Sequence, residues 1–443
     1  MMSRPDLEAV PIGVSGREVH RILDGVWPDL AALVPALGLV PGVDQFVLLD
    51  GEGWGNRVLA FDPERVLTVE DVSPFEELRR AVASWGQARD LHPLEGGRAL
   101  FGYLSYDAVR HLERLPTLAE DDLRLPDAQF ILPRYTVGTG PEGVWASVPA
   151  GESAGWILKA LRRSELLPNA TQSAPQVASS TLGRKGYLRA VERVKEYVRA
   201  GDIFQANISQ RFEVPFNGEP LALYAALKRR NPSPFAGMVS LPGLVAVSSS
   251  PERLVSLRGR LASTRPIAGT YPKGGGPALL LDPKERAEHA MIVDLERNDL
   301  GRSAAYGTVR VEEFMATETY SHVVHIVSEI SGELAPERDA VDLLAGMFPG
   351  GTITGCPKVR CMEIIEELEL VRRGLYTGSF GYLGLNGSAM DMNIVIRTIL
   401  LKDGTAYVQA GGGVVADSVP AREYRESVAK AAALLECLGT RAP

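Results

Sequence analysis

The sequence predicts a protein of mixed helices and strands, in which strands dominate the first 160 residues. Three observations lead to this prediction. Short apolar runs separated by proline and glycine fill residues 1–160 and are typical of strands. Apolar residues spaced three and four apart predict helices after residue 183. Alternating apolar and polar residues at 203–214 predict one further strand between those helices.

The strands predicted in the first part of the chain are the runs QFVLLD (45–50), ALFGYLSYD (99–107) and AQFILPRYTV (128–137). The longest apolar run, LAALVPALGLV at 30–40, is interrupted by Pro35 and predicts a buried helix or loop. It is shorter than the roughly 20 residues that a membrane-spanning helix needs. We therefore expect no membrane association.

The stretch LPNATQSAPQVASSTLG is rich in Ser, Ala, Pro and Gln, as linkers are. It divides the chain into an N-terminal domain at 1–166, a linker at 167–182 and a larger domain at 183–440. A length of 443 residues is sufficient for both.

The composition excludes several classes of protein. The net charge is −8 without any basic block, so nucleic acid is not an expected partner. The N-terminus lacks the pattern of a secretory signal, and three cysteines are too few for a disulfide framework. Cys356 and Cys361 have no histidine beside them, which argues against zinc. We expect a cytoplasmic protein.

A helix is predicted at 184–200, capped by Ser180 or Thr181 and ended by Gly201. Its apolar face is Tyr187, Val191, Val194 and Val198.

In the strand that follows this helix, two opposite faces are predicted. The apolar face comprises Phe204, Ala206 and Ile208, and the polar face comprises Gln205, Asn207 and Ser209. The polar face would be either wet surface or the lining of a cleft.

The segment 282–302 begins like a helix, with Asp282 as the N-cap and Pro283 in the first helical position. Glu288 falls on one face with three apolar residues, which are Met291, Ile292 and Leu295. A carboxylate in that place either reaches water at the edge of the face or is partly buried with a cation.

A last helix is predicted to start at 418–420, where Pro420 follows Ser418 and Val419. Glu423, Glu426 and Lys430 share its face. By itself this pattern indicates an exposed ion pair between Glu426 and Lys430.

Three glycine-containing stretches attract attention. PGGTITGCPK (349–358) lacks the ending of a nucleotide-binding loop, but free N–H groups there would suit an anion. QAGGGVVADS (409–418) predicts a turn that either approaches a ligand or is merely tight. RPIAGT (265–270) indicates a turn between strands, and Ala268 supplies no nucleophile.

Taken together, the motifs resemble those of the chorismate-utilising enzymes, from about residue 183 to 437. This family includes component I of anthranilate synthase and of aminodeoxychorismate synthase, and the isochorismate and salicylate synthases. The similar stretches, in order, are GDIFQANISQRF, SSSPERLV, RPIAGT, ERAEHAMIVDLERNDLGR, SHVVHIVSEISGEL, FPGGTITGCPKVRCMEIIEELE, DMNIVIRT and QAGGGVVADSVPAREYRESVAK. The resemblance implies an α/β fold of the α+β type, like anthranilate synthase component I, with two large antiparallel sheets layered with helices.

The resemblance also implies roles for individual residues. Glu288 and Glu426 match residues that bind Mg²⁺, and Glu288 and Thr352 are also expected to be catalytic. Gln205 and Ala268 are expected to contact the substrate. The remaining matches hold chorismate or act on it. Gly269 and Thr270 would contact the ligand, Thr352 and Tyr376 would position its ring, and His325 would be the catalytic histidine. Arg397 and Lys430 would bind the carboxylates, and Gly411 and Gly413 would donate backbone N–H groups to one of them.

The sequence favours amination over hydroxylation, because Gln205 lies where isochorismate and salicylate synthases have a water-activating lysine. Peripheral motifs such as NPSPFAG and GSFGYL resemble aminodeoxychorismate synthase. We therefore expect 4-amino-4-deoxychorismate as the product. Ala268 supports anthranilate as the alternative, since aminodeoxychorismate synthases commonly have a lysine there that attacks C2. If the product is aminodeoxychorismate, water or ammonia would replace that lysine.

No glutaminase motif is visible, so we expect a separate glutamine amidotransferase subunit as the source of ammonia. An aminodeoxychorismate product would need a further lyase to give 4-aminobenzoate for folate. A non-catalytic homologue is the hypothesis from another class, and the retained Glu288, His325 and Arg397 argue against it. The family's tryptophan pocket uses a stretch that reads VLLDGEG here, with Gly51 in place of serine, which makes feedback inhibition by tryptophan doubtful.

Overall fold

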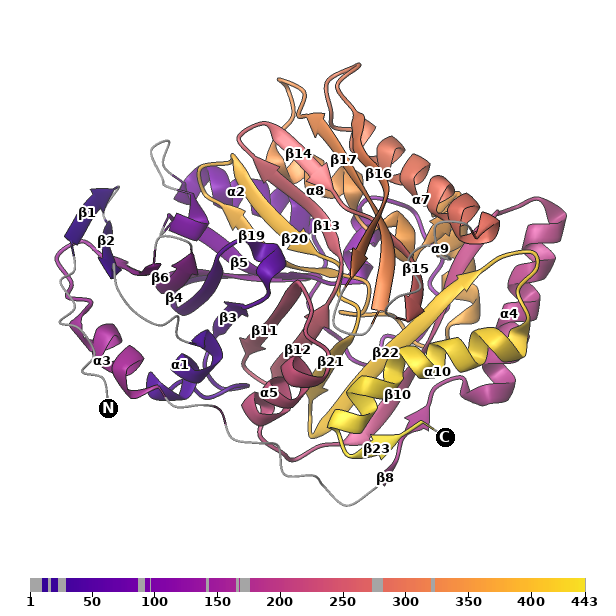
Figure 1. The fold of residues 1–443 in the computed structure, drawn as a ribbon, viewed down its shortest axis with the longest axis horizontal. Helices are drawn as coiled ribbons and strands as arrows, with labels where there is room; N and C mark the ends of the chain where they lie inside the picture. Colours follow the sequence, from indigo (N-terminus) through magenta and orange to yellow (C-terminus); the bar gives the residue numbers. More distant parts are fainter. Residues whose placement is uncertain are drawn as a thin grey trace.

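The structure is a computed structural model that describes residues 10–14, 17–22, 29–86, 92–95, 97–140, 143–164, 167, 176–272, 282–319 and 323–442. Its helices lie on the outside of a large sheet (Figure 1). They are α1 (Leu30–Ala36), α2 (Pro74–Trp85), α3 (Gly155–Arg163), α4 (Gly183–Ala200), α5 (Pro220–Arg230), α7 (Pro283–Gly301), α8 (Ala340–Met347), α9 (Lys358–Leu368) and α10 (Pro420–Cys437), with 3₁₀ turns η1 (Glu52–Trp54), η2 (Pro93–Glu95), η3 (Tyr106–His111) and η4 (Gly351–Ile353).

Twenty-one of the described strands are linked by pairing into one curled, antiparallel sheet. They are β1 (Val10–Val14), β2 (Arg17–Ile22), β3 (Phe46–Leu49), β4 (Arg57–Val69), β5 (Ala99–Leu104), β6 (Ala128–Gly140), β7 (Gly143–Pro149), β9 (Ser179–Ser180), β10 (Gln205–Pro215), β11 (Phe235–Leu241), β12 (Leu244–Ser250), β13 (Arg253–Arg258), β14 (Leu261–Thr264), β15 (Ile267–Pro272), β16 (Arg310–Thr319), β17 (Val323–Glu333), β18 (Gly355–Cys356), β19 (Ser379–Gly384), β20 (Ala389–Asn393), β21 (Thr398–Lys402) and β22 (Thr405–Val414). The strands β8 (Gln176–Val177) and β23 (Thr440–Arg441) form a separate parallel pair. The predicted fold class is confirmed, although the described strands form one linked sheet where two were expected.

Strands of the segment 1–166 pair directly with strands of the segment 183–440. β3 pairs with β11, placing Leu49 opposite Gly237, and β5 pairs with β19, placing Leu104 opposite Ser379. The sheet is therefore continuous between the segments 1–166 and 183–440. The division into domains stays a prediction, and residues 168–175 of the predicted linker lie outside the described residues.

Helices cover the sheet through apolar side chains. Leu33 of α1, Leu227 of α5 and Leu434 of α10 belong to one buried cluster with strand residues such as Phe212 and Val247. Figure 1 shows α10 running along β22, with α4 beside it. Burial of such side chains contributes about 25 cal/mol for each Å² of apolar surface removed from water.

Most elements predicted from periodicity are present. The strands predicted at 45–50, 99–107 and 128–137 correspond to β3, β5 and β6, and the run at 30–40 contains the buried helix α1. The helices predicted at 184–200 and 282–302 and from 418 are α4, α7 and α10. Helices α2 and α3 lie in the region read as mainly strands.

Three local predictions are wrong. Phe204 is 68% exposed and precedes β10, because the strand begins only at Gln205. Gly411–Gly413 belong to β22 and not to a turn. RPIAGT is likewise not a turn between strands, since β15 begins at Ile267 and pairs with β17.

Close approach of two backbones explains why glycine occupies β22. A Cβ atom at Gly411 would lie 2.2 Å from the carbonyl oxygen of Ile208 in β10. Among the described residues, no helix is long and apolar enough to cross a membrane.

Candidate active site

The centre of the candidate site is the part of β22 that extends beyond its pairing with β21. β21 pairs with β22 only as far as Val408, while β10 pairs with it up to Val414. The N–H of Asn207 donates to the carbonyl of Thr354 (2.9 Å), and the N–H of Ser209 donates to Glu369 Oε1 (2.8 Å). Neither of these two N–H groups donates a hydrogen bond to β22.

The strand partners of Asn207 and Ser209 are Gly413 and Gly411. Because hydrogen-bonded and non-hydrogen-bonded pairs alternate in an antiparallel ladder, the N–H groups of Gly411 and Gly413 point away from β10. They face the edge that β21 has left. Two backbone donors, as predicted for an anion, are therefore directed to one open edge.

The predicted magnesium ligands lie on the two sides of this glycine segment. On one side, Gln205 Nε2 donates to Glu288 Oε1 (3.2 Å), and a Cβ atom at Gly413 would lie 2.0 Å from the same nitrogen. On the other side, a Cβ atom at Gly412 would lie 3.6 Å from Glu426 Oε1. Glu288 and Glu426 are thus each adjacent to the segment Gly412–Gly413.

This arrangement fits a magnesium ion. Mg²⁺ is commonly held by one or two carboxylates and keeps other positions for water and substrate oxygens. Among the described residues, no group of three or more His, Cys, Asp or Glu side chains forms a closed metal site. Glu288 and Glu426 each offer the carboxylate oxygens that Mg²⁺ prefers, and their role as its ligands stays a prediction.

Lys430 lies at the same edge. Its Nζ donates to the carbonyl of Gly411 (3.1 Å) and forms an ion pair with Glu426 Oε1 (2.9 Å). The predicted ion pair between Glu426 and Lys430 is confirmed. Both side chains are more than 40% exposed, so the pair itself contributes little to stability.

Glu252 is a buried carboxyl that the sequence analysis did not single out. Burial raises its pKa to about 7, while Thr352, Arg397 and Lys430 lower it. The Thr352 hydroxyl lies beside this carboxyl, although no hydrogen bond of ordinary geometry joins the two groups. Burial therefore lets Glu252 keep its proton to a higher pH than an exposed glutamate does.

Arg397 is held in an uncommon backbone conformation beside this carboxyl, with a φ of 49°. Such angles are sparsely populated for residues other than glycine. Burial lowers the pKa of its guanidinium, and the nearby Glu252 opposes that shift. A buried guanidinium of this kind favours an anionic partner.

His325 is 4% exposed and lies on β17. Its neighbour Ile326 pairs with Ala268 of β15, which brings the RPIAGT segment next to the predicted catalytic histidine. The backbone of β15 includes Gly269 and Thr270, but the side chains of Ala268 and Thr270 lie outside the described residues.

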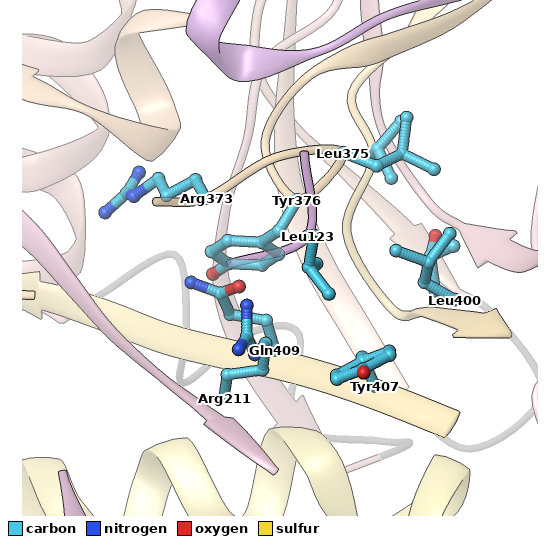
Figure 2. Close-up of a pocket in the computed structure, with 10 residues that line it drawn as sticks. Leu123, Arg211, Arg373, Leu375, Tyr376, Leu400, Tyr407 and Gln409 are labelled. Atoms are coloured by element: carbon cyan, nitrogen blue, oxygen red, sulfur yellow. The ribbon is translucent and has the colours of Figure 1, made fainter. Parts of the chain in front are cut away.

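Tyr376 lines a pocket together with side chains of β10, β21 and β22 (Figure 2). Its ring is 5.6 Å from the guanidinium of Arg373. Arg373 donates to the carbonyls of Ile353 (2.9 Å) and Asn207 (2.7 Å), so it ties the Tyr376 loop to η4 and β10.

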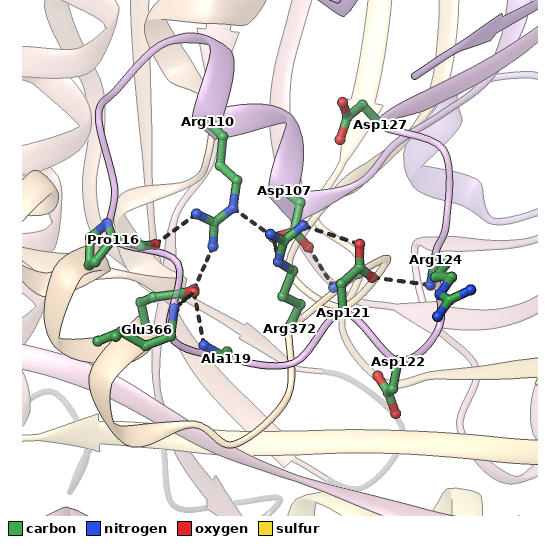
Figure 3. A network of polar contacts seen from close by, with 12 residues as sticks. Asp107, Arg110, Pro116, Ala119, Asp121, Asp122, Arg124, Asp127, Glu366 and Arg372 are labelled. Carbon is green, nitrogen blue, oxygen red and sulfur yellow. Dashed lines mark hydrogen bonds and ion pairs between the residues drawn. The ribbon is translucent and has the colours of Figure 1, made fainter. Parts of the chain in front are cut away.

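A second polar network holds the same loop from outside (Figure 3). Asp107 accepts from the N–H of Gly374 (3.0 Å), and burial raises the pKa of Asp107 to about 6 against the opposing effect of Arg110 and Arg372. Arg110 in turn bonds to Glu366 of α9 (2.6 Å). The position of Tyr376 is therefore fixed by charges from both ends of the sequence.

One N–H group of the glycine-rich segment at 349–358 binds a carboxyl of the protein itself. The N–H of Gly351 donates to Glu296 Oε1 (3.1 Å), so this group is not free for a ligand, and the anion site expected in the segment stays a prediction. Burial, reinforced by Asp299, raises the pKa of Glu296 to about 8, and Lys358 opposes the shift. This buried glutamate fixes the turn that carries Thr352.

The comparisons with known proteins agree with the geometry. A family model described as "chorismate binding enzyme" matches residues 44–436. The chain belongs to the chorismate-binding enzyme family. Anthranilate synthase component 1 of Thermus thermophilus is 45% identical over 96% of this chain and 88% of its own length. Aminodeoxychorismate synthase component 1 of Bacillus subtilis is 44% identical over 81% of this chain and 82% of its own length.

Solved structures support the same family. Anthranilate synthase component I from Streptococcus pneumoniae has a TM-score of 0.77 and 31% identity, covering 86% of this chain and 92% of that one. The menaquinone-specific isochorismate synthase from Escherichia coli, at 18% identity and a TM-score of 0.75, shares the fold over 98% of this chain and 96% of its own. This chorismate-binding enzyme therefore acts on chorismate, and its relatives carry names for two different products.

In this chorismate-binding enzyme, Trp54 fills the space beside the VLLDGEG stretch. The indole is fully buried, meets Phe235 edge-on (5.1 Å between ring centres) and donates to the carbonyl of Ala236 (3.0 Å). A Cβ atom at Gly51 would lie 2.0 Å from the carbonyl oxygen of Pro234. A side chain larger than hydrogen therefore does not fit at position 51, and the expected lack of feedback inhibition by tryptophan stays a prediction.

Proposed function

We propose that the protein joins ammonia to C2 of chorismate and releases anthranilate and pyruvate. Gln205 is the observation that carries the choice of ammonia over water. Its side chain is a neutral amide bonded to Glu288, in the place where the hydroxylating members of the family have a lysine. An amide cannot take a proton from water, whereas ammonia needs no base to act as a nucleophile.

The charged residues of the site suit a dicarboxylate. Glu288 and Glu426 would hold Mg²⁺, which when bound neutralises the negative charge of a carboxylate as a Lewis acid. Lys430 and the N–H groups of Gly411 and Gly413 are available to the same substrate carboxylate. Arg397 is available to the second one, and guanidinium can bind it through two parallel hydrogen bonds.

The first chemical step forms one bond and breaks another. The lone pair of ammonia bonds to C2, the ring double bonds shift, and the C4–O bond breaks. Glu252 in its acidic form donates the proton with which the hydroxyl leaves as water, and the new ammonium group loses one proton to solvent. The pKa of Glu252 near 7 makes this carboxyl a suitable acid at neutral pH.

The second step eliminates pyruvate. The C2 proton is lost, the C3–O bond breaks and the departing enolpyruvate takes up a proton to become pyruvate. His325, buried on β17, is the residue assigned to the departing group, either as a proton donor or as an electrostatic partner. Overall, chorismate and ammonia give anthranilate, pyruvate and water.

Ala268 supports anthranilate as the product. The lysine that attacks C2 in many aminodeoxychorismate synthases is absent from this position, so direct attack of ammonia at C2 is the simplest route. Thermus thermophilus anthranilate synthase component 1, similar over 96% of the chain, supports the same choice.

The second candidate product is 4-amino-4-deoxychorismate, which the peripheral motifs favour. The 44% identity to the Bacillus subtilis aminodeoxychorismate synthase component 1 supports it. Here a nucleophile from solvent, water or ammonia, would first occupy C2 and leave when a further ammonia attacks C4. This product would lead to 4-aminobenzoate and folate through a separate lyase.

Product analysis tests the proposal. The purified chain is incubated with chorismate, Mg²⁺ and ammonium, and products are separated and identified by mass spectrometry and fluorescence. Anthranilate and pyruvate in equal amounts are the expected result. Formation of 4-aminobenzoate only after addition of a lyase would replace the first candidate by the second.

A glutamine amidotransferase subunit is proposed as the physiological source of ammonia. The relatives named as component 1 support this partner, because the name implies a second component. Glutamine should replace ammonium only when that subunit is added.

A further inference from the structure

A small cavity adjoins the candidate site on the side of Gln205. It lies between α7, the start of β10 and the turn at 351–356, and its lining comprises Gln205, Asn207, Met291, Ile292, Leu295, Gly351, Thr352, Gly355 and Cys356. The centre of a water-sized molecule has about 10 Å³ in which to move. That is close to the minimum for one such molecule, so the cavity fits a single small ligand.

Two buried polar atoms lie on the cavity wall. Asn207 Oδ1 forms no hydrogen bond with the described residues, and Thr352 Oγ1 has only the carboxyl of Glu252 beside it, which leaves its lone pairs open to a donor. The amide nitrogen of Asn207 donates to the carbonyl of Thr352 (3.4 Å), which leaves the amide oxygen as the unsatisfied end. An unsatisfied buried acceptor costs about 1–3 kcal/mol, so a ligand with N–H or O–H donors would stabilise the site.

The cavity borders the reacting groups. Gln205 lines it and also bonds to Glu288, one of the two predicted magnesium ligands. Thr352 lines it and also lies beside Glu252. A molecule in the cavity is therefore adjacent both to the predicted cation and to the acidic carboxyl.

The lining distinguishes between the two possible small nucleophiles. No described residue of the lining is a Lys, His, Asp or Glu. Burial raises the pKa of the Cys356 thiol, so the thiol stays protonated. The lining itself therefore offers no base that could activate water. Neutral ammonia needs none, and the apolar side chains of Met291, Ile292 and Leu295 disfavour the charged ammonium ion.

We propose that this cavity is the ammonia site of the enzyme, in which ammonia donates hydrogen bonds to Asn207 Oδ1 and Thr352 Oγ1. Its lone pair is then free to face the substrate. Ammonium leaves its proton in solvent before entry, and no covalent bond changes on binding. The inference rests on the proposed amination, but it holds for attack at C2 and at C4 alike.

Steady-state kinetics of two Asn207 variants test this site. Asn207→Leu removes the amide oxygen with little change of volume, and Asn207→Ala removes it without adding bulk. Both should raise the KM for ammonium about tenfold, since tenfold corresponds to 1.4 kcal/mol and hence to one hydrogen bond. The KM for chorismate should stay within twofold.

The controls separate the possible causes. Asn386→Leu, the same substitution in the turn between β19 and β20, should leave both KM values unchanged. Thermal melting identifies a variant that fails to fold. If either Asn207→Leu or Asn207→Ala fails, the KM values of the remaining one decide the question.

Two outcomes would overturn the inference. If the Asn207→Leu and Asn207→Ala variants keep the original KM for ammonium, or if the KM for chorismate rises in step with it, the cavity is not the ammonia site. In either case the unmodified chain still aminates chorismate. If the unmodified chain forms no aminated product from ammonium, the proposed function itself fails, and the inference fails with it.

Discussion

Glu252 connects burial with both stability and chemistry. The side chain is 6% exposed, and burial raises its pKa to about 7 from the usual 4.5. The native state therefore keeps a proton between pH 4.5 and 7 that the unfolded chain has already released. For this reason the free energy of unfolding falls as the pH rises through that window.

Glu252→Gln should remove this pH dependence, because glutamine does not ionise. The variant should gain stability relative to the original protein as the pH rises from 5 to 8, by up to roughly 3 kcal/mol at 1.36 kcal/mol for each pKa unit. Urea-induced unfolding of both proteins at pH 5 and pH 8 measures the difference. An equal difference at the two pH values would show that Glu252 ionises normally.

Glu426→Gln tests the proposed magnesium ligand. Loss of one carboxylate charge should raise the Mg²⁺ concentration for half-maximal activity at least tenfold, and calorimetry with chorismate present should show weaker Mg²⁺ binding. Glu436→Gln, near the other end of α10, is the matched control and should change neither quantity. Equal effects of the two substitutions would show that Glu426 is not a magnesium ligand.

The glycine segment of β22 explains why a strand, and not a turn, can carry the site. Its glycines let β10 approach closely, and its unpaired edge directs two N–H groups to one place. Glycine has low strand propensity, which is why three consecutive glycines predicted a turn. The pairing that overrides this propensity comes from β10, two hundred residues earlier in the sequence.

Gly413→Ala and Gly412→Ala form a matched pair in this segment. A Cβ atom at Gly413 would lie 2.0 Å from Gln205 Nε2, so alanine must displace the amide from Glu288. A Cβ atom at Gly412 meets nothing closer than 3.6 Å. We expect kcat/KM to fall at least tenfold for Gly413→Ala and less than threefold for Gly412→Ala. The reverse order would contradict the placement of Gln205.

Periodicity predicted the elements that have one buried face. Tyr187, Val191 and Val194 are all buried in α4, as their spacing required. The helix α2 was missed although Ser73 caps it and Pro74 starts it, because the surrounding proline and glycine suggested strands throughout. Spacing places a residue on a face, but it does not say which elements meet.

For this reason the site itself could not be assembled from spacing. Gln205 bonds to Glu288, and Glu426 lies beside the glycine segment of β22, more than two hundred residues after Gln205 in the sequence. Only the resemblance to a family suggested that the three belong to one site. Glu252 stands in a quoted motif, SSSPERLV, but one glutamate after a strand carries no periodic signal. Its importance follows from burial, which the folded chain alone reveals.

Across the whole molecule, Trp54 joins the N-terminal strands to the rest of the sheet. Its ring packs against Phe235 and lies 5.7 Å from the ring of Phe380, two residues that belong to β11 and β19. The side chain is fully buried. Because Gly51 replaces the serine of the family's tryptophan-binding stretch, free tryptophan should leave the activity unchanged.

Trp54→Ala should lower the free energy of unfolding by about 3–5 kcal/mol, the usual effect of removing a large buried side chain. Trp156→Ala is the control, because Trp156 is 43% exposed and should cost about 1 kcal/mol or less. Chemical denaturation of the three proteins measures both values. Similar losses for the two variants would contradict the central packing role of Trp54.

The formation of a carbon–nitrogen bond is the central claim, and isotope labelling tests it most directly. The purified chain is given chorismate, Mg²⁺ and ¹⁵N-labelled ammonium in ¹⁸O-labelled water, and the products are analysed by mass spectrometry. The account predicts one ¹⁵N atom in the product, no ¹⁸O at the attacked carbon, and loss of the reaction when Mg²⁺ is removed. A hydroxylated isomer of chorismate that contains ¹⁸O and no ¹⁵N would contradict it.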